Sequence, residues 1–268
     1  MLYVLLFAIG ACIGSFVNVI AYRLPLGISF INGRSKCPFC VKEIAPYDLI
    51  PLFSFIFLRR RCRNCKATIS WQYLLVEILS GLIFAVSFLF FWPAVSIFYW
   101  LCFIFIVECL LSLAIVDSQY MILPDSLLVA ILIGWLTVSI LSSGFNPVEF
   151  AQLSLASVGW SATVFLIPFL IWRFSDGKWI GLGDAKLAGV LSLVFGITNT
   201  IYILYLAVIL GSLVGLGIMV LDRGDGKTKL PLGTFICFST IFFMFSGFDS
   251  AANAVQFIRY LIASFGVV

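Results

Sequence analysis

Eight apolar runs constrain this chain more than any other feature of its sequence. A helix needs roughly 20 residues to cross about 30 Å of hydrocarbon, and most of the runs reach that length. Hydrophobic residues make up 63% of the 268 residues and charged residues only 10%, which is typical of a polytopic membrane protein. We therefore predict an all-α polytopic membrane protein with about eight transmembrane helices. The runs cover residues 2–22, 72–91, 95–116, 125–143, 149–172, 185–197, 200–221 and 231–247.

Positively charged residues predict the orientation of these helices. Nine of the sixteen lie between residues 23 and 71, three flank residues 181–184, and three lie between residues 223 and 229. If the eight spans alternate, these fifteen residues fall on one side of the membrane. The positive-inside rule places that side in the cytoplasm and the amino terminus outside. The net charge of +4 therefore reflects topology, and no nucleic-acid partner is predicted. The tail at 251–268 fits either a segment that lies in the membrane interface or a further membrane-spanning helix.

Four cysteines in the one sizeable polar segment predict a metal site. Cys37 and Cys40 form one CxxC pair, Cys62 and Cys65 form another, and 21 residues separate the pairs. This spacing suits tetrahedral zinc, and four sulfur ligands leave no open position, so the zinc would be structural. The alternative is two disulfides, which need an oxidising compartment. Because the charge pattern places this segment in the cytoplasm, we favour zinc.

These features divide the chain into three predicted regions. Residues 1–22 form a first transmembrane helix, which we interpret as retained and not as a cleaved signal peptide. Residues 23–71 form a small zinc-binding cytoplasmic loop domain. Residues 72–268 form a transmembrane bundle.

Two acids at the edges of apolar runs are the candidate catalytic residues. Asp117 ends the third run, and Asp184 follows two glycines in Gly181-Leu182-Gly183-Asp184. The predicted topology puts both at the cytoplasmic side, where they could face each other across the bundle. Two carboxylates that meet in this way share one proton. The ionised acid would then take a proton from water, which attacks a peptide carbonyl, while its protonated partner donates. The alternative is that both acids only flank helix ends.

Other charged residues near the runs are not assigned to the catalytic pair. Asp125 follows Pro124 and is predicted to start a helix, which we favour over a catalytic role. Glu77 and Glu108 are costly to bury, but Glu108 lies nine residues before Asp117, on the opposite helical face, where it could make a helix-packing hydrogen bond or serve a proton relay. Lys186 is expected to extend its ammonium group to the membrane interface.

Taken together, the motifs of this chain resemble those of type IV prepilin peptidases, also called leader peptidases with N-methyltransferase activity. The matching motifs follow the family's order along nearly the whole chain, and the last of them has Leu232 where phenylalanine is more usual. They are Gly14-Ser15-Phe16-Val17-Asn18-Val19 continuing to Tyr22-Arg23-Leu24-Pro25, the two CxxC pairs, Leu75-Val76-Glu77, Asp117 with Leu123-Pro124-Asp125, Gly181 to Leu187, and Leu230-Pro231-Leu232-Gly233.

The resemblance implies an aspartic protease of the GxGD type in the bacterial inner membrane, distantly similar to presenilin and signal peptide peptidase. Such enzymes remove a basic leader from prepilin or pseudopilin precursors, cutting after a glycine at the cytoplasmic face, and Asp117 and Asp184 match their catalytic pair. Members with the amino-terminal loop are also expected to methylate the new N-terminal residue with S-adenosylmethionine. The resemblance therefore implies that residues 23–71 are the region associated with N-methyl transfer and that residues 72–268 are the aspartic protease bundle. The sequence contains no recognisable methyl-donor pocket, so this second activity follows from the resemblance alone.

Two other functions are considered. A proton- or cation-coupled transporter would use Asp117 and Asp184 as a relay, but relay acids usually lie nearer the bilayer midplane. A zinc-stabilised assembly protein without catalytic activity would tolerate replacement of either acid by asparagine, whereas a protease would not.

Overall fold

The computed structural model describes residues 1–92, 95–142, 147–222 and 230–246. In these residues the regular secondary structure is helical, apart from two isolated β-bridges. The chain divides into two compact units, Met1–Trp92 and Pro93–Val268. The tail at 251–268, whose membrane crossing the sequence left open, lies outside the described residues, as do the basic residues at 223–229.

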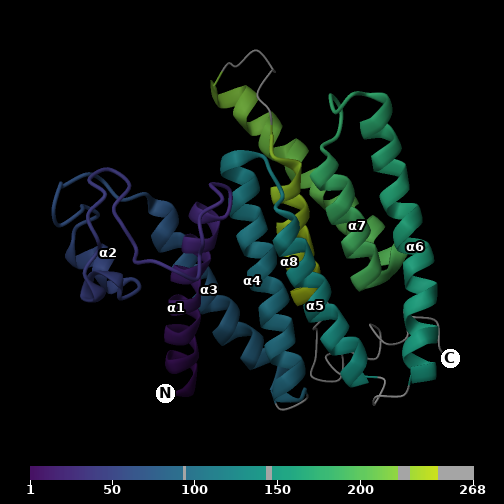
Figure 1. The fold of residues 1–268 in the computed structure, drawn as a ribbon, viewed down its shortest axis with the longest axis horizontal. Coiled ribbons are helices and arrows are strands. Elements are labelled where there is room, and N and C mark those ends of the chain that lie inside the picture. Colours follow the sequence, from purple (N-terminus) through teal and green to yellow (C-terminus); the bar gives the residue numbers. More distant parts are fainter. Residues whose placement is uncertain (93–94, 143–146, 223–229, 247–268) are drawn as a thin grey trace. The chain divides into compact units, whose positions relative to one another are not determined.

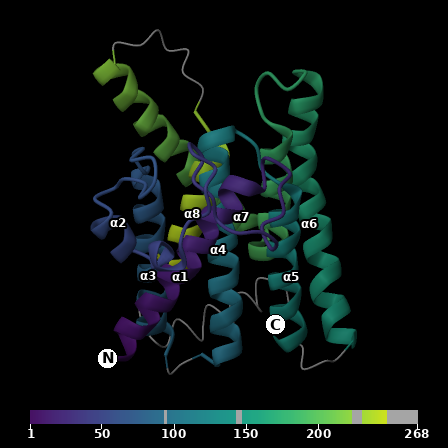
Figure 2. The ribbon, with the colours of Figure 1, turned by 60° about the vertical axis from the view of Figure 1, so that its left-hand side comes forward.

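The first unit is a pair of long helices joined by the cysteine-containing segment. Helix α1 (Leu2–Arg23) lies beside α3 (Trp71–Phe91), as Figure 2 also shows. A Cβ atom at Gly10 would lie 2.6 Å from the backbone oxygen of Ser80, so only glycine allows the two helices to approach this closely. Between them, the cysteine segment (residues 24–70) contains the 3₁₀ helix η1 (Pro46–Leu49) and the short helix α2 (Phe53–Phe57).

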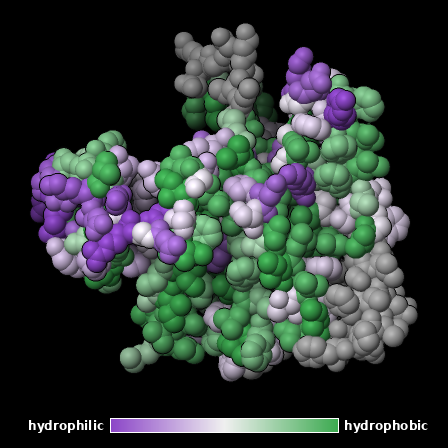
Figure 3. Space-filling view, in the orientation of Figure 1, coloured by the Kyte–Doolittle hydropathy of each residue, from purple (hydrophilic) through white to green (hydrophobic). Residues whose placement is uncertain are grey.

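The surface of the cysteine segment is more hydrophilic than the surface of the helices (Figure 3). Figure 3 shows hydrophilic side chains concentrated on that segment, whereas hydrophobic side chains cover much of the helical surface. On α1, for example, Val4 and Leu5 expose 73% and 58% of their surface. Apolar side chains that face outward along long helices suit a lipid environment, in which the helix satisfies its own backbone hydrogen bonds. The chain is therefore a helical polytopic membrane protein, as predicted.

The second unit is built around α4 (Ile97–Tyr120), which is buried along most of its length. Among the described residues, four further helices belong to this unit: α5 (Asp125–Ser142), α6 (Pro147–Phe174), α7 (Leu182–Asp222) and α8 (Leu232–Ser246). Helix α8 packs against both α4 and α7, and α6 packs against α7 (Figure 1). Most of the largest fully buried side chains lie on these helices, among them Leu110, Leu113, Leu187, Leu191, Phe195 and Ile236.

The predicted runs coincide with these helices, with two informative differences. Helix α4 continues past the end of its apolar run, through Asp117 and the polar residues that follow it, as far as Tyr120. It ends there because Met121 has a left-handed φ of 53°. The runs at 185–197 and 200–221 both lie in α7, which is two helices joined at Gly196. There φ is 77°, a left-handed value that favours glycine. Helix α5 begins at Asp125, as predicted.

Five helices in the described residues are long and apolar enough to cross a membrane: α1, α3, α4, α5 and α7. Two shorter apolar helices are Val158–Phe174, within α6, and α8. A straight helix of 41 residues would be about 60 Å long, roughly twice the hydrocarbon thickness. The break at Gly196 therefore fits the prediction that α7 contains two spans.

Candidate functional site

Asp117 lies in the last turn of α4 and is held by the start of α8. It is buried, with 5% of its surface exposed. Its Oδ2 accepts a hydrogen bond of 2.6 Å from the backbone N–H of Thr234, and the Thr234 hydroxyl lies 3.0 Å from the same oxygen. The first N–H groups of a helix have no partner within that helix, so they readily bind an anion. The start of α8 therefore fixes the orientation of this carboxylate.

Gly233, the residue before Thr234, permits this close approach. A Cβ atom at Gly233 would lie 2.9 Å from Asp117 Oδ2 and 3.0 Å from Leu123 Cδ1, so any side chain there would displace its neighbours. The sequence pointed to residues 230–233 only as a motif and gave no role to Thr234. The available signal was a hydroxyl residue in the first turn after Pro231-Leu232-Gly233, where it can bond an acid from another helix.

Asp184 is the third residue of α7, and its side chain turns back toward the start of that helix. The backbone N–H of Gly181 donates a hydrogen bond to the Asp184 carboxylate. A Cβ atom at Gly181 would lie 3.2 Å from Asp184 Oδ2. An acid at the third helical position that bonds the N–H just before the helix forms half of a capping box. The GxGD sequence is thus a helix start whose capping residue is the candidate catalytic acid.

The fold of the second unit brings the two candidate acids together. Asp117 and Asp184 lie close enough for their charges to interact, and the fully buried Cys237 on α8 lies near both of them. Leu123, in the connection after α4, links the same helix ends: Cβ atoms at Gly183 and Gly233 would each lie 3.0 Å from its side chain. The ends of α4, α7 and α8 therefore meet around one pair of carboxylates. Their catalytic role stays a prediction.

Lys186 and Asp125 form an ion pair beside this site. The Lys186 Nζ lies 2.7 Å from Oδ1 and 2.9 Å from Oδ2 of Asp125. The pair joins the first turn of α7 to the first residue of α5, and it is partly exposed. The expectation that Lys186 only extends to the membrane interface missed this partner. Because Lys186 is two residues from Asp184, the ion pair helps to hold the start of α7 in place.

Glu77 attaches the cysteine segment to α3. It is 7% exposed, and its Oε2 accepts a hydrogen bond of 2.8 Å from the backbone N–H of Leu52. Leu52 has a φ of 64°, an unfavourable value for a residue with a side chain. The bond to Glu77 therefore stabilises a strained turn at the start of α2.

The four predicted zinc ligands meet in one cluster. The Sγ atoms of Cys37, Cys40, Cys62 and Cys65 all lie within 4.8 Å of one another. Sγ of Cys37 lies 3.8 Å from Sγ of Cys65, far longer than a disulfide bond of about 2.05 Å. A tetrahedron of sulfur atoms around zinc, with Zn–S bonds of about 2.3 Å, has edges of roughly 3.8 Å. The geometry fits a metal held by four thiolates better than it fits the alternative of two disulfides.

Each CxxC pair lies in a turn of the same kind. Cys37 N–H donates to the carbonyl of Lys42, and Cys62 N–H donates to the carbonyl of Ala67, with a β-bridge beside each turn. Backbone N–H groups of Cys65 and Asn64 lower the pKa of the Cys62 thiol to about 7. A thiolate at this position is the form that binds a metal.

The pKa of the Cys65 thiol is shifted in the opposite direction, upward, because of its surroundings. The N–H of Ala67 lowers its pKa, but desolvation and bonds with the other three cysteines raise it, to about 11. Four thiols this close cannot all ionise cheaply unless a cation lies among them. The donor set therefore suits a divalent metal.

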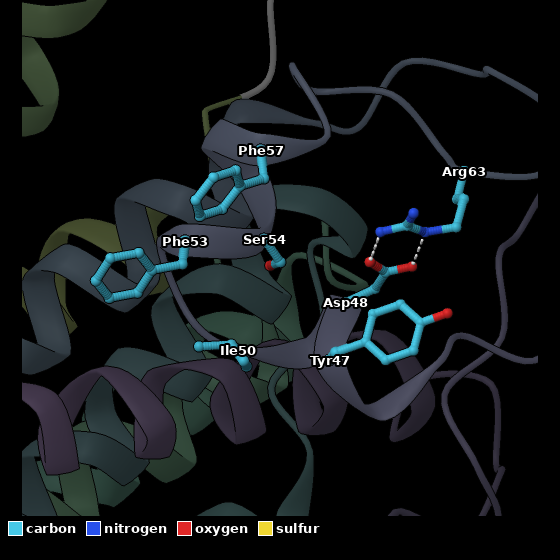
Figure 4. Close-up of a pocket in the computed structure, with 7 residues that line it drawn as sticks. All are labelled: Tyr47, Asp48, Ile50, Phe53, Ser54, Phe57 and Arg63. Carbon is cyan, nitrogen blue, oxygen red and sulfur yellow. Dashed lines mark hydrogen bonds and ion pairs between the residues drawn. The ribbon is translucent and has the colours of Figure 1, made fainter.

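A cavity of about 410 Å³ lies within the cysteine segment, next to the second CxxC turn (Figure 4). Asp48 and Arg63 form a bidentate ion pair at one side, with Nε to Oδ2 at 2.8 Å and Nη2 to Oδ1 at 2.6 Å. The Arg63 guanidinium lowers the pKa of Asp48 and also lies 5.1 Å from the centre of the Tyr47 ring. Sequence reasoning did not find this cavity. Its other lining residues include Ile50, Phe53 and Phe57.

Comparisons with known proteins agree along both units. Residues 8–91 match the model of the bacterial peptidase A24 N-terminal domain, and residues 104–216 match that of the type IV leader peptidase family. Each relative named here is a prepilin leader peptidase/N-methyltransferase. That of Bacillus subtilis (strain 168) is 30% identical over 88% of this chain and 91% of its own length. That of Aeromonas hydrophila is 30% identical, with 87% and 86% covered, and that of Pectobacterium carotovorum subsp. carotovorum is 31% identical, with 90% and 92% covered. No solved structure matches the chain.

Proposed function

This chain belongs to the type IV leader peptidase family, and on that premise we propose that Asp117 and Asp184 hydrolyse the leader peptide bond of prepilin-like precursors. The enzyme is a prepilin leader peptidase of the aspartic class with an N-methyltransferase activity. The observation that carries the catalytic assignment is the meeting of these two acids at the ends of α4 and α7. The family membership leaves no support for the transporter, because neither family model and none of the relatives above describes one.

The proposed mechanism uses the two carboxylates as a coupled pair that shares one proton. The ionised acid accepts a proton from water, and the resulting hydroxide attacks the carbonyl carbon of the peptide bond after the leader glycine. The protonated acid donates to the carbonyl oxygen. When the tetrahedral intermediate collapses, the C–N bond breaks and the leaving amine takes a proton from the pair. Thr234 holds Asp117 in position through its N–H and hydroxyl groups, and the Gly181 N–H holds Asp184.

The remaining assignments extend this proposal. The protein is a bacterial integral membrane protein, and we place it in the inner membrane with the amino terminus outside and the active site near the cytoplasmic face. The four clustered cysteines would hold a structural zinc ion, which stabilises the cysteine segment. S-adenosylmethionine supplies the methyl group for the N-terminal residue that cleavage exposes. The substrates would be prepilin or pseudopilin precursors presented from the membrane.

Cleavage of a pilin-like precursor by the purified enzyme in lipid vesicles tests the proposed function. Mass spectrometry of the products should find the leader cut off after its glycine. With S-adenosylmethionine present, the mature chain should also carry one methyl group on its terminal nitrogen. Without the methyl donor, cleavage should proceed and methylation should not. A precursor that remains intact with well-folded enzyme would contradict the peptidase assignment.

Thr234→Val tests whether the start of α8 positions Asp117. Valine keeps the shape of threonine and the backbone N–H but removes the hydroxyl. A hydrogen bond to a charged group contributes about 1.5–3 kcal/mol, so we expect the cleavage rate to fall at least about tenfold. Gly233→Ala should lower it further, because its Cβ atom would lie 2.9 Å from Asp117 Oδ2.

Thr240→Val is the matched control, since this buried threonine on the same helix bonds the carbonyl of Ile236 in its own helix and, among the described residues, no acid. It should cleave at close to the normal rate. If Thr234→Val does so as well, the start of α8 does not position Asp117.

The ion pair between Lys186 and Asp125 is expected to have a smaller effect. Exposed ion pairs contribute about 0.2–1 kcal/mol, so Lys186→Met and Asp125→Asn should each slow cleavage about two- to fivefold. Because each change removes the same interaction, the double variant should be little slower than either single variant. Rates measured for the four proteins form a double-mutant cycle. Effects that multiply would mean that the two residues act independently.

A further inference from the structure

The cavity in the cysteine segment has the size and the chemistry of a small-molecule site. Its volume of about 410 Å³ falls within the roughly 300–1,000 Å³ typical of such sites. All of its lining residues belong to the first unit (Figure 4). The mechanism proposed for Asp117 and Asp184, which lie in the second unit, does not use any of them.

One side of the cavity carries a paired acid and base. Asp48 accepts bonds from Nε and Nη2 of Arg63, and the Asp48 side chain is 8% exposed whereas that of Arg63 is 54% exposed. A guanidinium group has five N–H donors, so the two on Nη1 can still bind a carboxylate. Arg63 lies inside the second CxxC turn, between Cys62 and Cys65. The proposed zinc site therefore sets the position of this donor.

The other side of the cavity is lined by large apolar side chains. Phe53 and Phe57 are the first and last residues of α2, and they expose 61% and 81% of their surface. In Figure 4 their rings lie on the same side of α2, with Ile50 beneath them. Aromatic faces attract organic cations and stack on planar heterocycles. A ligand with both an adenine ring and a sulfonium ion would use such a surface.

We propose that this cavity binds S-adenosylmethionine, with its methionine carboxylate on Arg63 and its adenosyl and sulfonium groups against Phe53 and Phe57. The assignment rests on the N-methyltransferase activity proposed above. In the reaction, the neutral N-terminal amine of the cleaved substrate forms a bond to the methyl carbon. The carbon–sulfur bond breaks, its electron pair stays on sulfur to give the thioether, and the amine loses one proton to water.

Binding of S-adenosylhomocysteine, the unreactive product, tests the proposal directly. Equilibrium dialysis would use the full-length protein in lipid nanodiscs. We expect Phe57→Ala to weaken binding about tenfold, and Arg63→Lys, which keeps the charge but loses the planar fork, to do the same. Ile56→Ala is the matched control: Ile56 is 67% exposed on the same short helix but does not line the cavity. It should bind with unchanged affinity.

The outcomes separate this proposal from the proposed function. If the unaltered protein binds the probe and both variants bind it equally well, the cavity is not the methyl-donor site, although the methyltransferase assignment stands. If Ile56→Ala weakens binding as much as Phe57→Ala, the α2 surface acts through lipid or folding and the cavity assignment fails. If the unaltered protein cleaves a precursor but binds no probe, both the cavity and the methyltransferase are wrong. Zinc content shows whether Arg63→Lys has disturbed the cysteine turn, in which case Phe57→Ala alone decides.

Discussion

Replacing either Asp117 or Asp184 with asparagine is expected to slow leader cleavage by about 10³-fold or more. Asparagine keeps the size and planarity of the side chain, so the packing around Gly233 and Gly181 should survive. It can neither take a proton from the attacking water nor donate one from a carboxyl group, and each step needs one of these transfers. Single-turnover cleavage in vesicles measures the effect, because product release does not then limit the rate.

Asp176→Asn provides the control for a change in net charge. Asp176 is exposed in the loop before α7 and has a φ of 49°, which asparagine also tolerates. This variant should cleave normally. If Asp117→Asn and Asp184→Asn also cleave normally while folded, the two acids are structural and the aspartic-protease mechanism is wrong. If they fail to cleave but still methylate a peptide supplied without its leader, the second activity belongs to another site.

The helices, the cysteine turns and the two acids could be predicted from the sequence, because each depends on a short local pattern that favours a single structure. Apolar runs of about 20 residues have few stable forms outside a membrane helix, so helices such as α1 and α3 matched their runs within a residue or two. The cysteines were equally predictable, because two CxxC pairs are short enough to fix their own turns. Asp117 and Asp184 stood out because acids are rare beside apolar runs.

Features that depend on contacts between distant residues were not predictable in this way. Thr234 lies 117 residues from Asp117, and a hydroxyl residue in the first turn of a helix does not show which distant acid it bonds. Asp125 looked like a helix-start residue and does begin α5, but its bond to Lys186 depends on how α5 and α7 pack. The cavity beside Arg63 is assembled from a loop without periodicity, so no sequence pattern marks it.

Removal of zinc should unfold the cysteine segment, because that segment has almost no core of its own. Of residues 24–70, all of which the structure describes, only Cys37 and Phe55 are buried. So small a core cannot offset the conformational entropy of more than forty residues. In zinc-finger peptides the metal contributes about 10–16 kcal/mol, which is enough to decide whether a small domain folds.

Cys62→Ser and Cys65→Ser should therefore lose zinc, become sensitive to limited proteolysis between residues 24 and 70, and lose methyl transfer at least about tenfold. Cys12→Ser is the control, since Cys12 is an exposed cysteine on α1 outside the cluster. This variant should keep its zinc and its resistance to protease.

Cleavage should fall much less than methyl transfer in the cluster variants, because Asp117 and Asp184 both belong to the other unit. Zinc-free variants whose cysteine segment stays protected would mean that the segment folds without a metal. Equal loss of both activities would mean that the cysteine segment also serves the peptidase, by presenting the precursor to it.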